Sequence, residues 1–499
     1  MNSKQIYLFI VGFSFLVLLA SCSDSNQALG PVIDATNNGF ETYEVAKVFA
    51  EKCAIPACHS SDNPQHGLSF ANYYDMLNGS VNRPLDDSSH HHTPKILHDD
   101  ESLYGGSPVV PYDTSSSLLY NLITGHVEDA DLRMPYLLDP LTNAEIELIK
   151  NWILNGAKDF QGNVPYAASD YIYACSQFGD KILAVDPASN LLARTIDVNF
   201  SSSNIDQPHN VKKFGNYLYA SIITAGKFLK IDIPTNTIVG TVDGLQQPGM
   251  IEISSDGKKA YVSKSATATG NNNEIYFINT ESMTLEETFL LPETGLPHGM
   301  AISSDDNFLY VANMTKDKIS IVDLTTNEFV ENINLSSSGL LEHEPMHLYI
   351  SPDDNYLYAC CRTSSKVLII STSTRQIIQS IDIQDHPMQA AISNDGLTIY
   401  VVSHHEPIVT TIKKDPISES WTKDLEYGNP AFQHLYGADL STDGKYLYMT
   451  CSNEENDFSP HYSIPGVERQ SLLCVYDTEL KEVVKIIDLG SYATGITAR

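Results

Sequence analysis

The sequence predicts two unlike parts: a small all-α domain at residues 40–160, followed by an all-β seven-bladed propeller at residues 166–499. In the first part apolar residues recur at helical spacing, whereas the second part consists of short alternating strands separated by turns. A unit of about forty residues repeats through the second part, as expected for propeller blades. We therefore expect a multidomain chain whose last strand closes the ring.

Helices are expected at both ends of the first part. Apolar residues recur at helical spacing in Tyr43–Phe49 and again in Ile146–Ile153. Thr142 stands three residues before Glu145, which is the pattern of a capping box, and Gly156 is the expected stop of that helix.

The repeat predicts how the ring closes. The first unit, Asp170–Val198, lacks the opening Pro-x-Gly strand, and the chain ends with Ala493–Arg499, which resembles that strand alone. The C-terminus should therefore complete the first blade and leave no exposed sheet edge. The other six units begin at Pro208, Pro248, Pro297, Pro345, Pro387 and near Leu435.

The N-terminus has the pattern of a secretory signal. Lys4 precedes an apolar run, Ile6–Leu19, that is shorter than the ~20 residues of a spanning helix, although an uncleaved membrane anchor is the alternative. The run ends in Leu-Ala-Ser-Cys22, and its resemblance to bacterial lipoproteins implies cleavage after residue 21 and lipidation of Cys22. We expect a tether at residues 22–39 and an extracytoplasmic, lipid-anchored protein, at the periplasmic face or cell surface and preferentially at the outer membrane.

Charge restricts the partners. The chain has 62 acidic and 30 basic residues, a formal charge of −32, which disfavours nucleic-acid phosphates and suits a neutral or basic redox partner protein. Five further cysteines are scattered, apart from the adjacent pair Cys360-Cys361, and are expected to be buried core residues, with one disulfide among them as the alternative. They are Cys175, Cys360, Cys361, Cys451 and Cys474.

The most informative motif is Cys53-Ala-Ile-Pro-Ala-Cys58-His59, directly after the first expected helix. Two thiols beside an imidazole can attach a c-type haem: the thiolates form thioethers with the vinyl groups and the histidine binds the iron. Four residues separate the cysteines instead of the usual two, and Pro56 would let the extra residues bulge. A local Cys53–Cys58 disulfide is the alternative.

A second axial ligand is expected at Met134, within Arg133-Met134-Pro135, because a thioether opposite a histidine raises the potential of a haem. His126 is the competing ligand. The run His90–His92 lies among Asp and Ser residues and predicts a solvated loop with adventitious metal binding.

Four ordered motifs over residues 40–160 resemble the cytochrome c-like domains of Planctomycetes and Bacteroidetes proteins. They are the Cys/Cys-His site, Val109-Val-Pro-Tyr-Asp-Thr-Ser-Ser-Ser-Leu-Leu-Tyr120, Met134-Pro, and the helix ending Trp152-Ile-Leu-Asn-Gly-Ala157. Tyr112 stands where that family has glycine. The resemblance implies one covalent haem c, with Cys53 and Cys58 as thioether sites and His59 and Met134 as axial ligands.

The propeller repeats resemble the YVTN family, with Leu309-Tyr-Val-Ala-Asn313 as the nearest match. His209 and His298 follow the proline that opens their innermost strands, and His386 and His434 fall two residues earlier with the same parity. These four could line the channel and hold copper or a second haem, or could be packing residues. His404-His405 lies on a different strand and is not expected to contribute.

Three functions follow from these patterns. The leading one is an extracytoplasmic electron-transfer lipoprotein whose propeller recognises a partner or substrate. The second is an oxidoreductase whose propeller holds another metal or haem, an architecture that resembles periplasmic nitrite reductases. The third is a haem-free, surface-binding propeller. No Gly-x-Ser-x-Gly motif or phosphate-binding glycine loop occurs in the sequence, so we assign no catalytic residue.

Overall fold

The computed structural model describes residues 32–62, 64–79, 107–128, 130–167, 170–264, 272–429, 431–455, 464–465 and 467–499. The expected signal peptide, the lipidation site Cys22 and the run His90–His92 lie outside these residues. Within the described ranges, no helix is long and apolar enough to cross a membrane.

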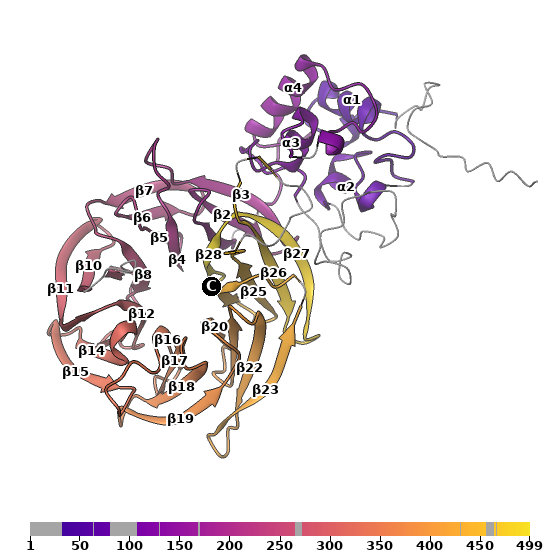
Figure 1. Ribbon diagram of the computed structural model, residues 1–499. Coiled ribbons are helices and arrows are strands. Elements are labelled where there is room, and N and C mark those ends of the chain that lie inside the picture. Colours follow the sequence, from indigo (N-terminus) through magenta and orange to yellow (C-terminus); the bar gives the residue numbers. More distant parts are fainter. Residues whose placement is uncertain are drawn as a thin grey trace, which may run out of the picture.

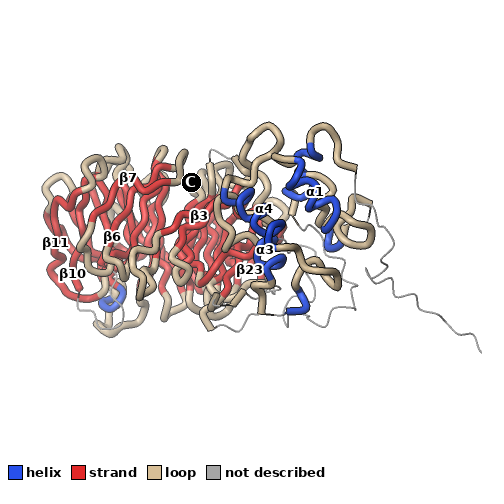
Figure 2. The backbone as a smooth tube through the Cα atoms, turned by 90° about the horizontal axis from the view of Figure 1, so that it is seen from above, coloured by secondary structure: helices blue, strands red, loops and turns tan. Residues whose placement is uncertain are grey.

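The helices gather beside a ring of strands (Figure 1), and a perpendicular view places them at one side of that ring (Figure 2). The α-helices are α1 (Tyr43–Lys52), α2 (Tyr73–Leu77), α3 (Leu118–Thr124) and α4 (Asn143–Leu154). Short 3-10 helices are η1 (Asn37–Gly39), η2 (Gln65–Gly67), η4 (Ala130–Leu132) and η5 (Met314–Lys316).

The strands form seven four-stranded antiparallel sheets, here blades one to seven. Blade one is β28 (Ala493–Thr497), β1 (Ile172–Ser176), β2 (Lys181–Asp186) and β3 (Leu191–Asp197); blade two is β4 (Pro208–Phe214), β5 (Tyr217–Ile222), β6 (Lys227–Asp232) and β7 (Thr237–Val242). Blade three is β8 (Pro248–Ile253), β9 (Lys259–Lys264), β10 (Asn272–Asn279) and β11 (Thr284–Gly295); blade four is β12 (Pro297–Ile302), β13 (Phe308–Asn313), β14 (Lys318–Asp323) and β15 (Glu328–Asn334). Blade five is β16 (Pro345–Ile350), β17 (Tyr356–Cys361), β18 (Lys366–Ser371) and β19 (Gln376–Asp382); blade six is β20 (Pro387–Ile392), β21 (Thr398–Ser403), β22 (Ile408–Lys414) and β23 (Trp421–Gly428). Blade seven is β24 (Leu435–Leu440), β25 (Tyr446–Cys451), β26 (Gln470–Asp477) and β27 (Glu482–Ser491).

The C-terminal strand closes the ring as the repeat predicts. Residues of β28 pair with β1, with Tyr173 opposite Thr497 and Ala174 opposite Ile496. Every residue of β28 is buried, because it lies innermost in blade one. The prediction of seven blades completed by the chain end is confirmed.

Aspartates in the turns between the first two strands of a blade tie neighbouring blades together. The backbone N–H of Ser255 in blade three donates to both carboxylate oxygens of Asp306 in blade four, at 2.9 and 3.0 Å. Ser304 donates to Asp354 of blade five in the same way, at 3.1 and 3.0 Å. These acidic residues therefore stabilise turns and blade contacts, as turn-forming Asp residues do.

The five propeller cysteines are fully buried, as expected. All are free thiols, so the alternative of a disulfide among them is not found in the structure. The closest contact between them joins the Sγ atoms of Cys451 and Cys474 on adjacent strands, at 3.6 Å.

The helical part has its own apolar core, which includes Phe40, Phe49, Phe70 and Trp152. Helix α4 begins with the predicted capping box, in which Thr142 and Glu145 satisfy each other's backbone N–H groups. The helix ends before Gly156, whose φ of +103° suits glycine. The expected start and stop of this helix are confirmed.

A polar contact joins the helical part to blade one. The Asp113 carboxylate accepts hydrogen bonds from the Lys181 ammonium at 2.6 Å and the Thr195 hydroxyl at 2.7 Å. Burial opposes ionisation of Asp113, but Lys181 and the hydrogen bonds outweigh it and lower the pKa of the carboxyl. The Ser107 hydroxyl also donates to the Leu192 carbonyl at 2.9 Å.

Candidate functional site

The residues of the Cys53–His59 motif form a compact turn at the end of α1. The N–H of Cys53 still donates to Phe49 of the helix, at 3.0 Å, and the N–H of His59 returns to the carbonyl of Cys53, at 3.1 Å. Ala57 adopts the left-handed conformation, with φ of +66°, inside this turn. The four intervening residues are therefore absorbed in a closed loop that keeps both cysteines and the histidine together.

The His59 ring is held by the chain that follows. Its Nδ1 lies 2.9 Å from the Leu68 carbonyl, and its plane meets the Phe70 ring edge-on at a centroid distance of 5.4 Å. Burial lowers the pKa of His59, although the Leu68 and Gln65 carbonyls oppose this effect. A neutral ring that donates from Nδ1 keeps its lone pair on Nε2, which is the form that binds metals.

Cys53 and Met134 border the same apolar core from two distant parts of the chain. Both are partly buried against the core of the helical part. Met134 is positioned by its N–H, which donates to the Leu122 carbonyl of α3 at 3.1 Å. Burial, with the neighbouring Cys58 and Glu145, raises the pKa of the Cys53 thiol to about 12. Both Cys53 and Cys58 are free thiols, so the alternative of a local disulfide is not found in the structure.

The backbone conformation of Tyr112 is one that glycine adopts easily. Tyr112 has a φ of +70°, in the left-handed region that glycine enters most easily. Its N–H donates to the Ile153 carbonyl at the end of α4, and the Arg194 guanidinium of blade one lies 5.8 Å from its ring centre. Tyr112 therefore has a backbone conformation that suits glycine, and its side chain adds a contact to the propeller.

His126 lies away from this turn. It lines a cavity of about 710 Å³ between α3 and blades one and seven, where Lys181 and Asp488 also contribute. No described contact joins His126 to His59.

Two of the predicted propeller histidines, His209 and His298, lie buried in the channel. Their rings are 6.3 Å apart, and His347, which the sequence reasoning missed, follows at 5.1 Å from His298. Burial lowers the pKa of His209 to about 3 and that of His298 to about 4, so both rings are neutral near pH 7. The three imidazoles are buried, and the Met346 carbonyl accepts a hydrogen bond from His298 at 2.8 Å.

The other two predicted histidines, His386 and His434, lie at the end of the channel where the innermost strands begin. In six of the seven blades the residue before that strand has a positive φ, between 47° and 63°. The residue after the second strand donates its N–H to the carbonyl of this left-handed residue; in blade six His404 donates to His386 at 2.9 Å. This register brings two positions to one rim in six blades; in blade three the residue after the second strand lies outside the described residues. The left-handed residues are Gln207, Gln247, Glu344, His386, His434 and Tyr492.

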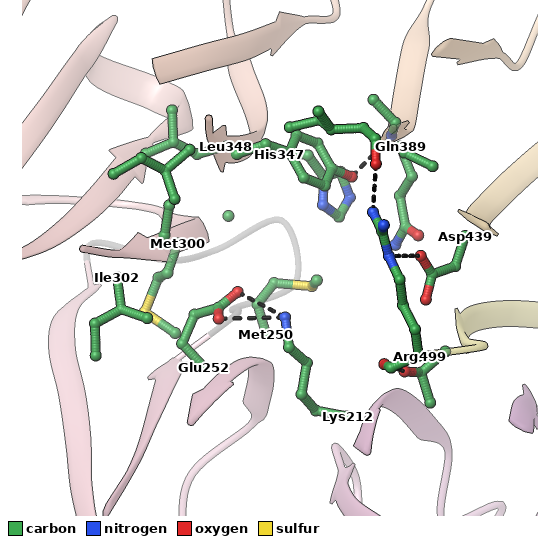
Figure 3. Close-up of a pocket in the computed structure, with 18 of the residues that line it drawn as sticks. Lys212, Met250, Glu252, Met300, Ile302, His347, Leu348, Gln389, Asp439 and Arg499 are labelled. Carbon is green, nitrogen blue, oxygen red and sulfur yellow. Dashed lines mark hydrogen bonds and ion pairs between the residues drawn. The ribbon is translucent and has the colours of Figure 1, made fainter. Parts of the chain in front are cut away.

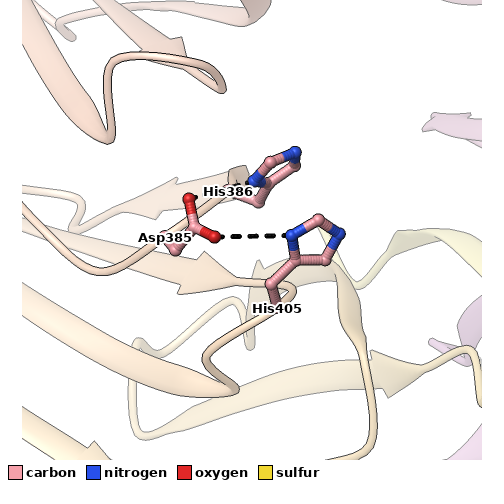
Figure 4. A group of neighbouring side chains, drawn as sticks. All are labelled: Asp385, His386 and His405. Carbon is pink, nitrogen blue, oxygen red and sulfur yellow. Dashed lines mark hydrogen bonds and ion pairs between the residues drawn. The ribbon is translucent and has the colours of Figure 1, made fainter.

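Charged and imidazole side chains of blades five to seven meet at this rim. Arg362 pairs with Glu344 at 2.8 Å, and His404 Nε2 contacts Glu454 at 2.8 Å. Asp385 contacts the rings of both His386 and His405 (Figure 4). We call this group the mouth cluster: Glu344, Arg362, Asp385, His386, His404, His405, His434 and Glu454.

The expectation that His404-His405 would not contribute is wrong. The His404 ring is tilted against that of His434 at a centroid distance of 5.0 Å, and the His405 ring is tilted against that of His386 at 3.7 Å. His404 and His405 directly follow β21, which ends at the mouth beside the start of the innermost strand β20. The repeat could have indicated that His404 lies at the mouth. In blade five, Arg362 directly follows the second strand, as His404 does in blade six.

The opposite end of the channel opens into a cavity of about 500 Å³ (Figure 3). Two ion pairs cross its wall, Lys212 with Glu252 at 3.2 Å and the C-terminal Arg499 with Asp439 at 3.4 Å. The charges of these four residues are paired within the protein.

Comparisons with known proteins place the propeller among familiar folds. The family model "Lactonase, 7-bladed beta-propeller" matches residues 219–332 and 293–376, less than half of the chain. A functionally unknown protein from Desulfotomaculum acetoxidans is similar at TM-score 0.54 and 13% identity, over 66% of this chain and 98% of that one. The periplasmic gluconolactonase of Pseudomonas aeruginosa is similar at TM-score 0.51 and 14% identity, over 66% and 98%. No curated protein sequence matches the chain.

These similarities support a seven-bladed propeller that resembles the lactonase type. At such low sequence identity, the similar structures support the fold and say nothing about the activity of this chain. The matched ranges end at residue 376, before the mouth residues of blades six and seven.

Proposed function

We propose that this chain is an extracytoplasmic electron-transfer protein that holds one covalent haem c in its helical part and uses the propeller to recognise a partner. The observation that carries the proposal is the contact between His59 Nδ1 and the Leu68 carbonyl, at the end of a turn that also contains Cys53 and Cys58. This contact sets the ring tautomer in the way that ligating histidines are usually set.

The neighbouring residues fit the same group. Cys53 and Met134 are partly exposed at the edge of an apolar core, where a porphyrin face could be shielded from water. His59 and Met134 would be the axial ligands, and Cys53 and Cys58 the covalent attachment points. The bound haem would supply a one-electron couple whose potential a Met ligand raises.

The remaining residues orient and isolate the site. Phe70 and Phe49 stack at 5.2 Å and fix the wall behind His59, while the Leu68 carbonyl holds the ring. The net charge of −32 favours a neutral or basic redox partner. A lipid on Cys22 would keep the protein at a membrane surface, preferentially the outer membrane.

The test is the mass of the chain matured in a host that attaches c-type haem. The wild type is expected to carry one haem that resists acid–acetone extraction, and the double variant Cys53→Ala/Cys58→Ala none. Cys360→Ala, which removes a thiol buried in the propeller, should keep the haem. A wild-type chain without covalent haem would refute the proposal and favour the haem-free binding propeller.

A further inference from the structure

The carboxylate of Asp385 lies between two imidazole rings at the channel mouth. Its Oδ1 is 3.0 Å from His386 Nδ1, and its Oδ2 is 3.4 Å from His405 Nδ1 (Figure 4). One ligating atom from each residue can be chosen so that all three lie within 4.8 Å of one another. All three residues belong to blade six. Asp385 and His386 precede its innermost strand, and His405 follows its second strand.

The spacing of these atoms matches that of ligands around one metal ion. Nitrogen and oxygen ligands lie about 2.0–2.1 Å from a tetrahedral zinc ion, so two such ligands are separated by about 3.3 Å. The two contacts of Asp385, at 3.0 Å from Oδ1 and 3.4 Å from Oδ2, are close to this separation, and one ligating atom from each of the three residues lies within 4.8 Å of the other two. A metal could therefore replace the shared protons with small movements of the side chains.

The backbone fixes the three residues before any metal binds. His386 has a φ of +54°, the left-handed conformation that the residue before the innermost strand adopts in six of the seven blades, so the repeat itself sets this backbone geometry. The N–H of His404 donates to the His386 carbonyl at 2.9 Å, which locks the two segments together. The Ser365 hydroxyl donates to Asp385 at 3.2 Å and orients the carboxylate from outside.

The chemistry of the group suits a borderline metal. Two imidazoles and one carboxylate are ligands of zinc, iron, nickel and copper ions, whereas magnesium and calcium prefer oxygen alone. His405 is half-exposed and His386 partly buried, which leaves a route for an ion from solvent.

We propose that Asp385, His386 and His405 bind one divalent transition-metal ion at the channel mouth. Three protein ligands leave at least one coordination position for water or a small ligand, as in catalytic rather than structural zinc sites. The site uses no residue of the helical part, so it does not depend on the proposed haem.

Zinc binding to the full chain tests this site, measured by isothermal titration calorimetry with ZnCl₂ and by metal analysis. His90–His92 are replaced by alanine in every sample, because that run is an expected adventitious ligand. The reference chain is expected to bind one Zn²⁺, and His405→Gln, His386→Gln and Asp385→Asn should each weaken binding by at least about tenfold. The matched control is His343→Gln, a mouth-side histidine whose Nδ1 contacts Ser364 instead of the site.

His405→Gln decides the outcome if the other variants fold poorly, because its side chain is half-exposed and its loss should leave the melting temperature unchanged. Equal zinc affinity in His405→Gln and the reference chain would overturn the proposal. So would the absence of zinc binding in the reference chain, or an equal loss in the His343→Gln control.

Discussion

The Cys53–His59 turn and the mouth cluster both gather imidazoles with other ligating groups, but they do so in opposite ways. The turn places three such residues within seven positions, closed by one hydrogen bond from His59 to Cys53. The mouth takes residues from positions 344 to 454 and aligns them through a register that each blade repeats. The first kind of site depends on local backbone, whereas the second depends on the whole ring.

Their surroundings differ as well. His59 contacts the Phe70 ring and the carbonyls of Leu68 and Gln65, and burial lowers its pKa. At the mouth each carboxylate already has a cationic or imidazole partner, such as Glu454 with His404. An apolar wall suits a large planar cofactor, and a polar rim suits a small ion or anionic ligand. Two sites in one chain can thus differ in the ligands they select.

Removing β28 is the change with the largest expected effect, and it acts on the ring of the propeller. Deletion of residues 493–499 opens the ring and exposes the partner edge of β1, including the surface that Ile496 buries. Lost burial and ladder hydrogen bonds should cost more than ~3 kcal/mol of propeller stability. Urea unfolding followed by fluorescence measures this, with Arg499→Ala as the control that retains the strand. An unchanged midpoint in the deletion would show that closure does not hold the ring.

Met134→His tests the ligand pair proposed for the helical part. Because a thioether ligand raises the potential of a haem, the variant should have a midpoint lower by on the order of 0.1 V, within the roughly 0.8 V range that axial ligands set. Redox titration of the matured protein measures it. His126→Gln is the matched control and should leave the midpoint unchanged; a shift in the control alone would transfer the ligand role to His126.

Asp113→Asn should weaken the junction between the two regions by about 1–2 kcal/mol, because it removes the charged partner of Lys181. The folded-state pKa of Asp113 is lowered, so its contribution is fully present above the unfolded pKa of about 3.9 and is lost as pH falls below it. Limited proteolysis between pH 6 and about pH 3 follows the junction. Loss of protection at low pH to the same extent in the variant would contradict this assignment.

Thr142→Ala should have the smallest effect, a loss of about 1 kcal/mol in the helical part alone, because it removes the N-cap of α4. Thermal unfolding monitored by helical circular dichroism measures it. Glu145→Gln keeps a side chain that can complete the capping box and should lose less. An equal loss in the two variants would mean that glutamine at position 145 does not complete the capping box.

Sequence reasoning predicted the elements whose determinants are local. The Thr142–Glu145 cap and the stop at Gly156 follow from residues a few positions apart. Ring closure could also be predicted, since the missing strand of blade one and the surplus strand at the C-terminus are complementary.

The mouth cluster could be predicted only in part. Strand parity pointed to His386 and His434, but it gave no reason to include His404 or His405 on the second strand. Their proximity arises from a backbone hydrogen bond at the mouth, in which the N–H of His404 donates to the carbonyl of the left-handed residue His386. That conformation has no sequence signature here, because Gln, Glu, His and Tyr all occupy it.

The most direct test of the central claim is the redox spectrum of the natively matured chain. The account predicts one reversible c-type haem couple per chain, with a sulfur-to-iron absorption in the oxidised state that disappears in Met134→Ala. A natively matured chain without any reversible haem band would contradict it, and the Cys53–His59 turn would then need another role.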